Sequence, residues 1–111
     1  MRKGIEIETD TLGTGQETAR GDTVTIRYQL SLNRGEVIQC EEATFTVGQR
    51  RVIAGLEYGV EGMRVGGRRR FRVGPHLAYR EAGVEGIVPP NAILIFEVEL
   101  LAVQPQSEPA S

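Results

Sequence analysis

The chain is short of the residues on which disulfides, metal centres and membrane anchors depend. Its 111 residues include one cysteine and one histidine, which excludes an internal disulfide and a zinc cluster. No apolar run approaches membrane-spanning length, and residues 1–10 lack the apolar stretch of a secretory signal. The formal net charge of −2 argues against nucleic-acid binding. We therefore expect no metal, cofactor, membrane or nucleic-acid partner, and a cytoplasmic location because the lone Cys40 fits a reducing compartment.

The remaining composition is that of an ordinary globular domain, with 40% hydrophobic and 25% charged residues. The length suits one domain with a substantial core and leaves no room for a second. We expect residues 1–103 to form this domain as a monomer. The polar, proline-containing residues 104–111 are expected to be a disordered tail.

Alternating apolar and polar residues predict short strands along most of the chain. The predicted strands lie at 3–8, 22–32, 36–40, 44–47, 68–74 and 92–103. Asn33, Arg34 and Gly35 are predicted to form a hairpin turn, because glycine readily takes a positive φ. Short connections without repeated helical crossovers favour an antiparallel sheet. We therefore expect an α+β fold in which five or six antiparallel strands curl around one short helix.

One segment breaks the alternation and predicts the helix. Ile53, Leu56 and Val60 recur at helical spacing, so residues 52–60 are expected to form about two helical turns. Gly59 near the end suits a left-handed cap. Gly55 inside the helix costs ~1 kcal/mol relative to alanine, so another element is expected to pack closely against it.

The arginines between residues 68 and 72 admit two interpretations, a nucleic-acid surface or an ion-paired sheet face. In a strand Arg68, Arg70 and Arg72 share one face, whereas Arg69 lies on the other. Neighbouring predicted strands supply opposite charges at Glu6, Glu8, Glu97 and Glu99. Cross-strand ion pairing is therefore the favoured interpretation. The lone Cys40 is expected to be a small buried residue, not a reactive thiol.

Three motifs in the second half of the chain occur in a distinctive order. They are VIAGLEYGVEGM, which begins at Val52, GPHLAY, which begins at Gly74, and IVPPNAILIFEVELL, which begins at Ile87. With these motifs the chain resembles the FKBP family of peptidyl-prolyl cis-trans isomerases, the immunophilins that bind tacrolimus and rapamycin. The resemblance runs from Gly4 to Val103. It implies the half-barrel fold of that family and isomerisation of X–Pro bonds in proteins, assisting their folding.

The implied reaction is consistent with the absence of a nucleophile or a metal. Rotation about a peptide bond meets a barrier of ~18–20 kcal/mol from amide resonance. An apolar pocket favours the twisted amide, which has lost charge separation, and each 1.36 kcal/mol gained is tenfold in rate. The resemblance assigns catalytic roles to Tyr28, Ile53 and Tyr79: a pocket wall, a backbone N–H donor and a hydroxyl donor. It assigns substrate binding to Tyr28, Ile38, Gln39, Val52, Ile53, Leu56, Tyr79, Val84, Val88 and Phe96.

The chain departs from the family pattern on one side of this expected pocket. Leu56 stands where the family usually has a tryptophan floor, and Ile38-Gln39 replaces an aromatic residue followed by aspartate. The segment between Ile38 and Phe45 is also shorter, with Ala43 near another aromatic position. These changes predict a weaker isomerase that binds macrolides poorly. They leave open a second interpretation, a module that holds proline-containing or apolar segments without useful catalysis.

Overall fold

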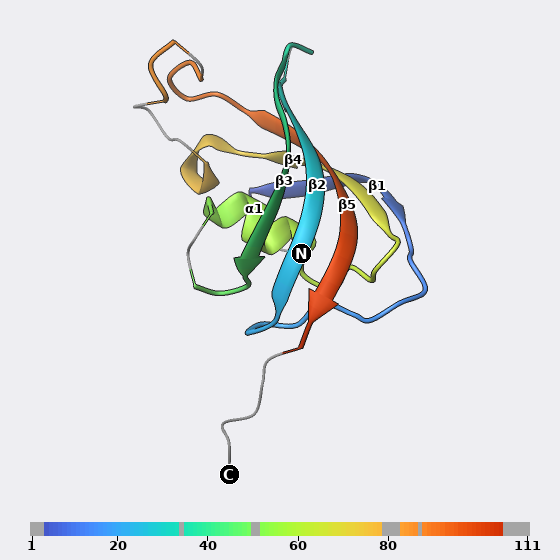
Figure 1. Cartoon of the computed structure of the whole chain (residues 1–111). Coiled ribbons are helices and arrows are strands. Elements are labelled where there is room, and N and C mark those ends of the chain that lie inside the picture. The colour runs from blue at the N-terminus through green and yellow to red at the C-terminus, as the bar shows by residue number, and fades with distance from the viewer. Residues whose placement is uncertain (1–3, 34, 50–51, 79–82, 87, 106–111) are drawn as a thin grey trace.

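Across the residues that it describes, the computed structural model has five antiparallel strands in one curved sheet, with a single α-helix against one face (Figure 1). It describes residues 4–33, 35–49, 52–78, 83–86 and 88–105. The elements are β1 (Ile5–Thr11), β2 (Thr23–Leu32), β3 (Val37–Thr46), α1 (Ala54–Val60), β4 (Arg68–Val73), the 3-10 helix η1 (Pro75–Leu77) and β5 (Leu94–Gln104). The order across the sheet is β1-β4-β5-β2-β3. The expected α+β architecture is confirmed.

The sheet has an inner face, covered in part by α1, and an outer face. On the inner face Val24, Ile26 and Leu30 of β2 are buried, as are residues of β4 and β5. The buried inner residues of β4 and β5 include Phe71, Val73, Leu94, Phe96, Val98 and Leu100. This is the period-2 alternation that the sequence predicts, because strands with one buried face must keep their register.

Several boundaries and roles differ from the sequence prediction. The first strand, expected at residues 3–8, is β1 at Ile5–Thr11, because its pairing with β4 continues to Thr11 and Arg68. Residues 36–40 and 44–47 were expected to be two strands, but β3 is continuous and pairs with β2 from Val37 to Thr46. The helix begins at Ala54, because Ile53 is still extended at φ −59° and ψ 148°. The last strand includes Gln104, which pairs with Thr23, and residues 106–111 of the expected tail lie outside the described residues.

Gly59 also differs from the prediction, because it lies within α1 and is not its left-handed cap. The first glycine after α1, Gly62, is the one that takes a positive φ here, at 79°. A Cβ at Gly59 would collide with the ring of Phe71, so this glycine serves close packing between α1 and β4. The close packing expected at Gly55 is confirmed, because a Cβ there would lie 3.0 Å from Val73 Cγ2 and 3.1 Å from the Leu77 carbonyl oxygen.

Arg69 fixes the end of the helix from the neighbouring strand. Its side chain, 8% exposed, points to the inner face from β4. Nη1 donates to the carbonyl oxygens of Gly59 and Glu61, both at 2.8 Å, and Nη2 lies 3.1 Å from Asp10 Oδ2. These carbonyls belong to the last turn of α1, where backbone acceptors lack partners within the helix. A cation at this end also interacts favourably with the helix dipole.

In the described part of the chain, α1 and η1 are too short and insufficiently apolar to cross a membrane. The same residues contain no group of three or more His, Cys, Asp or Glu side chains that could hold a metal ion.

Candidate functional site

A cavity of about 430 Å³ opens on the inner face between the sheet and the start of α1. Its described lining residues are Tyr28, Leu30, Gln39, Val52, Ile53, Leu56 and Phe96. The two strands β2 and β3 supply one side, β5 another, and the segment entering α1 the third. The lining carries no formal charge among these residues. Its side-chain polar groups are the Tyr28 hydroxyl and the Gln39 amide.

Ile53 presents backbone groups at the point where α1 begins. Its carbonyl oxygen accepts from the N–H groups of Leu56 at 3.0 Å and Glu57 at 3.3 Å. The N–H of Ile53 has no partner among the described residues. An N–H at a helix start that is not engaged within the helix can donate to a ligand carbonyl. Ile53 thus lines the cavity and carries a backbone N–H that no described residue engages.

The aromatic wall of the cavity is continuous with the core. The rings of Tyr28 and Phe96 are tilted by 50°, with centroids 5.9 Å apart. Phe96 also stacks on Phe71, at 5.6 Å and 18°. Phe71 and Phe96 are buried, and Tyr28 is half-buried at the cavity. Tilted and offset-stacked pairs of this kind stabilise one arrangement of the wall.

Two features place the helix start beside the sheet. Gly55 lets α1 approach Val73 and Leu77, as described above. Glu57, also buried, accepts the Gly48 N–H at 2.8 Å through Oε2 and so links α1 to the segment that follows β3. Leu56 is 4% exposed. It lines the cavity where the cavity meets the core and so forms part of its floor.

The structure brings most of the expected site residues together. Six of them line the cavity: Tyr28, Gln39, Val52, Ile53, Leu56 and Phe96. Ile38 and Val84 are partly buried against the same core, and Val88 is 5% exposed within it, but none of the three is among the cavity-lining residues described. Val84 and Val88 pair through N–H to carbonyl hydrogen bonds of 2.8 and 2.7 Å. Tyr79 lies outside the described residues.

Leu30 is the lining residue that the sequence analysis did not assign to the site. It stands two residues beyond Tyr28 on β2 and opposite Gln39 on β3. The period-2 alternation that placed Tyr28 on the inner face carries the same signal for Leu30.

Comparison with known proteins decides the family. A family model described as FKBP-type peptidyl-prolyl cis-trans isomerase matches residues 15–101. The chain belongs to this family. FK506-binding protein 1A of Neurospora crassa is 41% identical over 107 residues, which are 91% of this chain and 89% of that protein. FK506-binding protein 4 of Emericella nidulans is 43% identical over 106 residues, although the chain spans 22% of that protein's length.

The fold of this FKBP-type chain is also that of a solved isomerase. The crystal structure of a peptidyl-prolyl cis-trans isomerase from Pseudomonas syringae pv. tomato matches with a TM-score of 0.82 and 28% sequence identity. The match covers 93% of this chain and 77% of the other. The family and enzyme class expected from the three motifs are therefore confirmed.

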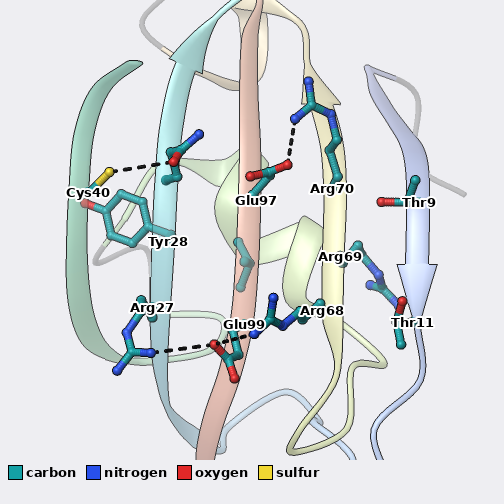
Figure 2. Close-up of a pocket in the computed structure, with 12 residues that line it drawn as sticks. Thr9, Thr11, Arg27, Tyr28, Cys40, Arg68, Arg69, Arg70, Glu97 and Glu99 are labelled. Atoms are coloured by element: carbon teal, nitrogen blue, oxygen red, sulfur yellow. Dashed lines mark hydrogen bonds and ion pairs between the residues drawn. The ribbon is translucent and has the colours of Figure 1, made fainter.

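A second hollow of about 390 Å³ lies on the outer face of this FKBP-type sheet (Figure 2). It is a valley between two rows of side chains that cross the strands. One row contains Thr11, Arg68, Glu99 and Arg27, and the other contains Thr9, Arg70, Glu97, Gln29 and Cys40. Arg69, Val98 and Tyr28 also line this valley, although alternate residues of a strand point to opposite faces. The hollow thus follows from the pleat and twist of a charged sheet face.

The charged groups around the outer hollow are paired with one another. Arg68 Nη2 and Arg27 Nη1 lie 3.6 and 3.7 Å from Glu99 Oε1 (Figure 2). Arg70 bridges two carboxylates, 2.9 Å from Glu8 Oε1 and 2.7 Å from Glu97 Oε1. Ion pairing of the arginine strand is confirmed for three of the four expected glutamates, whereas Glu6 has no ion pair among the described residues.

This pairing changes ionisation on the outer face. The hydrogen bond from Arg70, with a further one from Arg72, lowers the pKa of the Glu8 carboxyl below its ordinary value. Hydrogen bonds to Glu97 and Glu8 raise the pKa of Arg70. The expectation for Cys40 was wrong, because the thiol is exposed on this face, with Sγ 3.9 Å from Gln29 Oε1. An edge strand leaves its outer side chains in solvent, and β3 is an edge.

Proposed function

We propose that the inner cavity binds the proline of an X–Pro segment and accelerates its cis-trans isomerisation, assisting the folding of proline-containing proteins. The observation that carries the proposal is the convergence of Tyr28, Ile53 and Phe96 on one uncharged cavity. The Ile53 N–H, without a partner among the described residues, is placed to donate to a substrate carbonyl. No bond is broken in this reaction, so the cavity needs no nucleophile.

The uncharged lining supplies the rate enhancement in this mechanism. A planar amide separates charge between oxygen and nitrogen, and the twisted amide at the barrier top separates it less. Transfer from water into an uncharged cavity therefore favours the twisted form relative to the planar one. A difference of about 4 kcal/mol corresponds to roughly a thousandfold in rate. The resemblance gives Tyr79 a second hydrogen bond to the substrate.

The direct test is an isomerisation assay with short X–Pro peptides. We expect a rate above the uncatalysed background, reduced about tenfold or more by Phe96→Leu, because the wall loses an aromatic side chain that faces the cavity. Arg27→Gln is the matched control, since its side chain lies on the outer face and is exposed. A folded wild-type protein that gives no rate above background would exclude isomerase activity.

The residues at the floor and on one wall of the inner cavity indicate a reduced isomerase activity. Leu56 and Gln39 are both among the lining residues, at the positions where the resemblance calls for tryptophan and aspartate. The combined substitutions Leu56→Trp and Gln39→Asp should raise kcat/KM by about tenfold, which corresponds to 1.36 kcal/mol at the barrier. An unchanged kcat/KM would mean that these two positions do not limit the reaction.

A second candidate function is binding of proline-containing segments without useful catalysis, and the same two lining residues favour it. It predicts that a proline peptide shifts the Ile53 amide resonance in NMR spectra while peptide exchange stays at the uncatalysed rate. Relatives named FK506-binding proteins support weak macrolide binding at the same cavity. Competition between FK506 and the peptide for the Ile53 resonance would test that proposal.

A further inference from the structure

Glu41 lies on the cavity side of β3. It pairs in register with Tyr28, and its neighbour two residues earlier, Gln39, pairs with Leu30. Residues i and i+2 of a strand share a face, and directly opposed residues have Cβ atoms about 4.5–5.5 Å apart. Tyr28, Leu30 and Gln39 all line the cavity. The exposed side chain of Glu41 therefore stands at the rim of the cavity beside Tyr28.

The carboxylate of Glu41 has no ion-pair partner among the described residues. The next residue gives the contrast, because Glu42 points to the outer face, where its Oε2 lies 3.4 Å from Arg27 Nη2. The described cavity lining is itself uncharged. Glu41 thus adds a negative charge, not neutralised by a described neighbour, next to an uncharged site. An edge strand needs charge to deter association with other strands, but Glu42 already meets that need without facing the cavity.

We propose that Glu41 determines substrate specificity by favouring X–Pro segments with lysine or arginine next to the proline and disfavouring those with aspartate or glutamate. The inference rests on the proposed isomerase function of the cavity. An exposed ion pair changes a binding equilibrium by about twofold to fivefold, and repulsion of an acidic residue acts in the opposite direction by a similar factor. Because the charge interacts with the planar and twisted amide alike, the preference belongs mainly to KM.

The test compares kcat/KM for two peptide series at low salt, Ala-Xaa-Pro-Phe and Ala-Phe-Pro-Xaa, with Xaa as lysine, glutamine or glutamate. In the wild-type protein we expect lysine to exceed glutamate by about tenfold in at least one series. Glu41→Gln should reduce this ratio to below about twofold, and Glu41→Lys should invert it. Glu42→Gln, the adjacent change on the other face, should keep the wild-type ratio. All other charges are common to these proteins, so the differences isolate Glu41.

Added salt should lower the wild-type ratio, because exposed charges are screened over about 8–10 Å at ordinary ionic strength. Equal rates for the lysine and glutamate peptides in both series would overturn the inference, as would an equal loss of preference in Glu42→Gln. Turnover of the glutamine peptides without a charge preference would overturn this inference and leave the proposed isomerase function standing. If no peptide were turned over, both proposals would fail.

Discussion

Replacement of Gly59 by alanine should destabilise the domain although alanine is the better helix former. The residue lies inside α1, directly against the ring of Phe71 on β4. A Cβ at this position would overlap the tip of the ring and lie 2.7 Å from Cε1. Phe71 is fully buried and stacks on Phe96 at 5.6 Å, so the ring cannot move away without displacing the cavity wall.

The expected magnitude is a difference between two effects. Adding a methyl group to a packed core costs about 1–3 kcal/mol, and the constrained ring places Gly59→Ala at the upper end. Removal of glycine from a helix interior returns about 1 kcal/mol. The net loss should therefore be about 2 kcal/mol of unfolding free energy, which lowers Tm by about 10 °C in a domain of this size.

Urea unfolding followed by far-UV circular dichroism measures the loss, provided that the m-value is unchanged. The double variant Gly59→Ala/Phe71→Leu provides the control, because leucine lacks the ring tip that the new methyl group would meet. We expect the double variant to be about 2 kcal/mol more stable than the sum of the single losses predicts. An unchanged or raised stability for Gly59→Ala, or strict additivity in the double variant, would refute the close-packing role.

Three further predictions concern the end of α1 and the outer face of the sheet. Arg69→Met should cost about 3 kcal/mol in thermal unfolding, because the carbonyls of Gly59 and Glu61 lose a buried donor; a neutral result would contradict the capping role. Arg70 lowers the pKa of Glu8 below the ordinary 4.5, so the stabilisation is present above that pH and is lost as pH falls through the lowered pKa. Glu8→Gln should therefore reduce the fall in stability as the pH drops below about 4.5, and a wild-type pH profile would contradict this. Exposed Cys40 should react with a thiol reagent as fast in the native protein as in urea, whereas strong protection would argue against its exposure.

The sequence predicted the strands that have one buried face. In β2, β4 and β5 the alternation separates the core side from solvent, which also placed Tyr28 and Phe96 on the inner face. It failed in the middle of β3, where Glu41 and Glu42 lie on an edge strand that gives neither side chain a buried environment. A stretch that is polar on both faces shows no alternation of apolar and polar residues, so it gives no signal for a strand.

The remaining features depend on contacts between distant segments. Nothing in residues 68–73 shows that Arg69 will meet the end of a helix, because that contact exists only after α1 packs on β4. The position of the cavity also depends on contacts between segments that are distant in the sequence. Alternation places side chains on the inner face, but the part of this face left uncovered is set by how closely Gly55 and Gly59 let α1 approach. Leu30 was missed for that reason.

The position of β5 in the sheet has a consequence for the order of folding. This strand follows the other four described strands in the sequence, yet it lies between β4 and β2 and hydrogen-bonds to both. Until residues 94–104 have been synthesised, β1–β4 and β2–β3 can exist only as two separate pairs. Isolated two-stranded pairs are marginally stable in water, and contacts between distant residues form slowly. The cavity wall that includes Phe96 can therefore be completed only after the other four described strands have been synthesised.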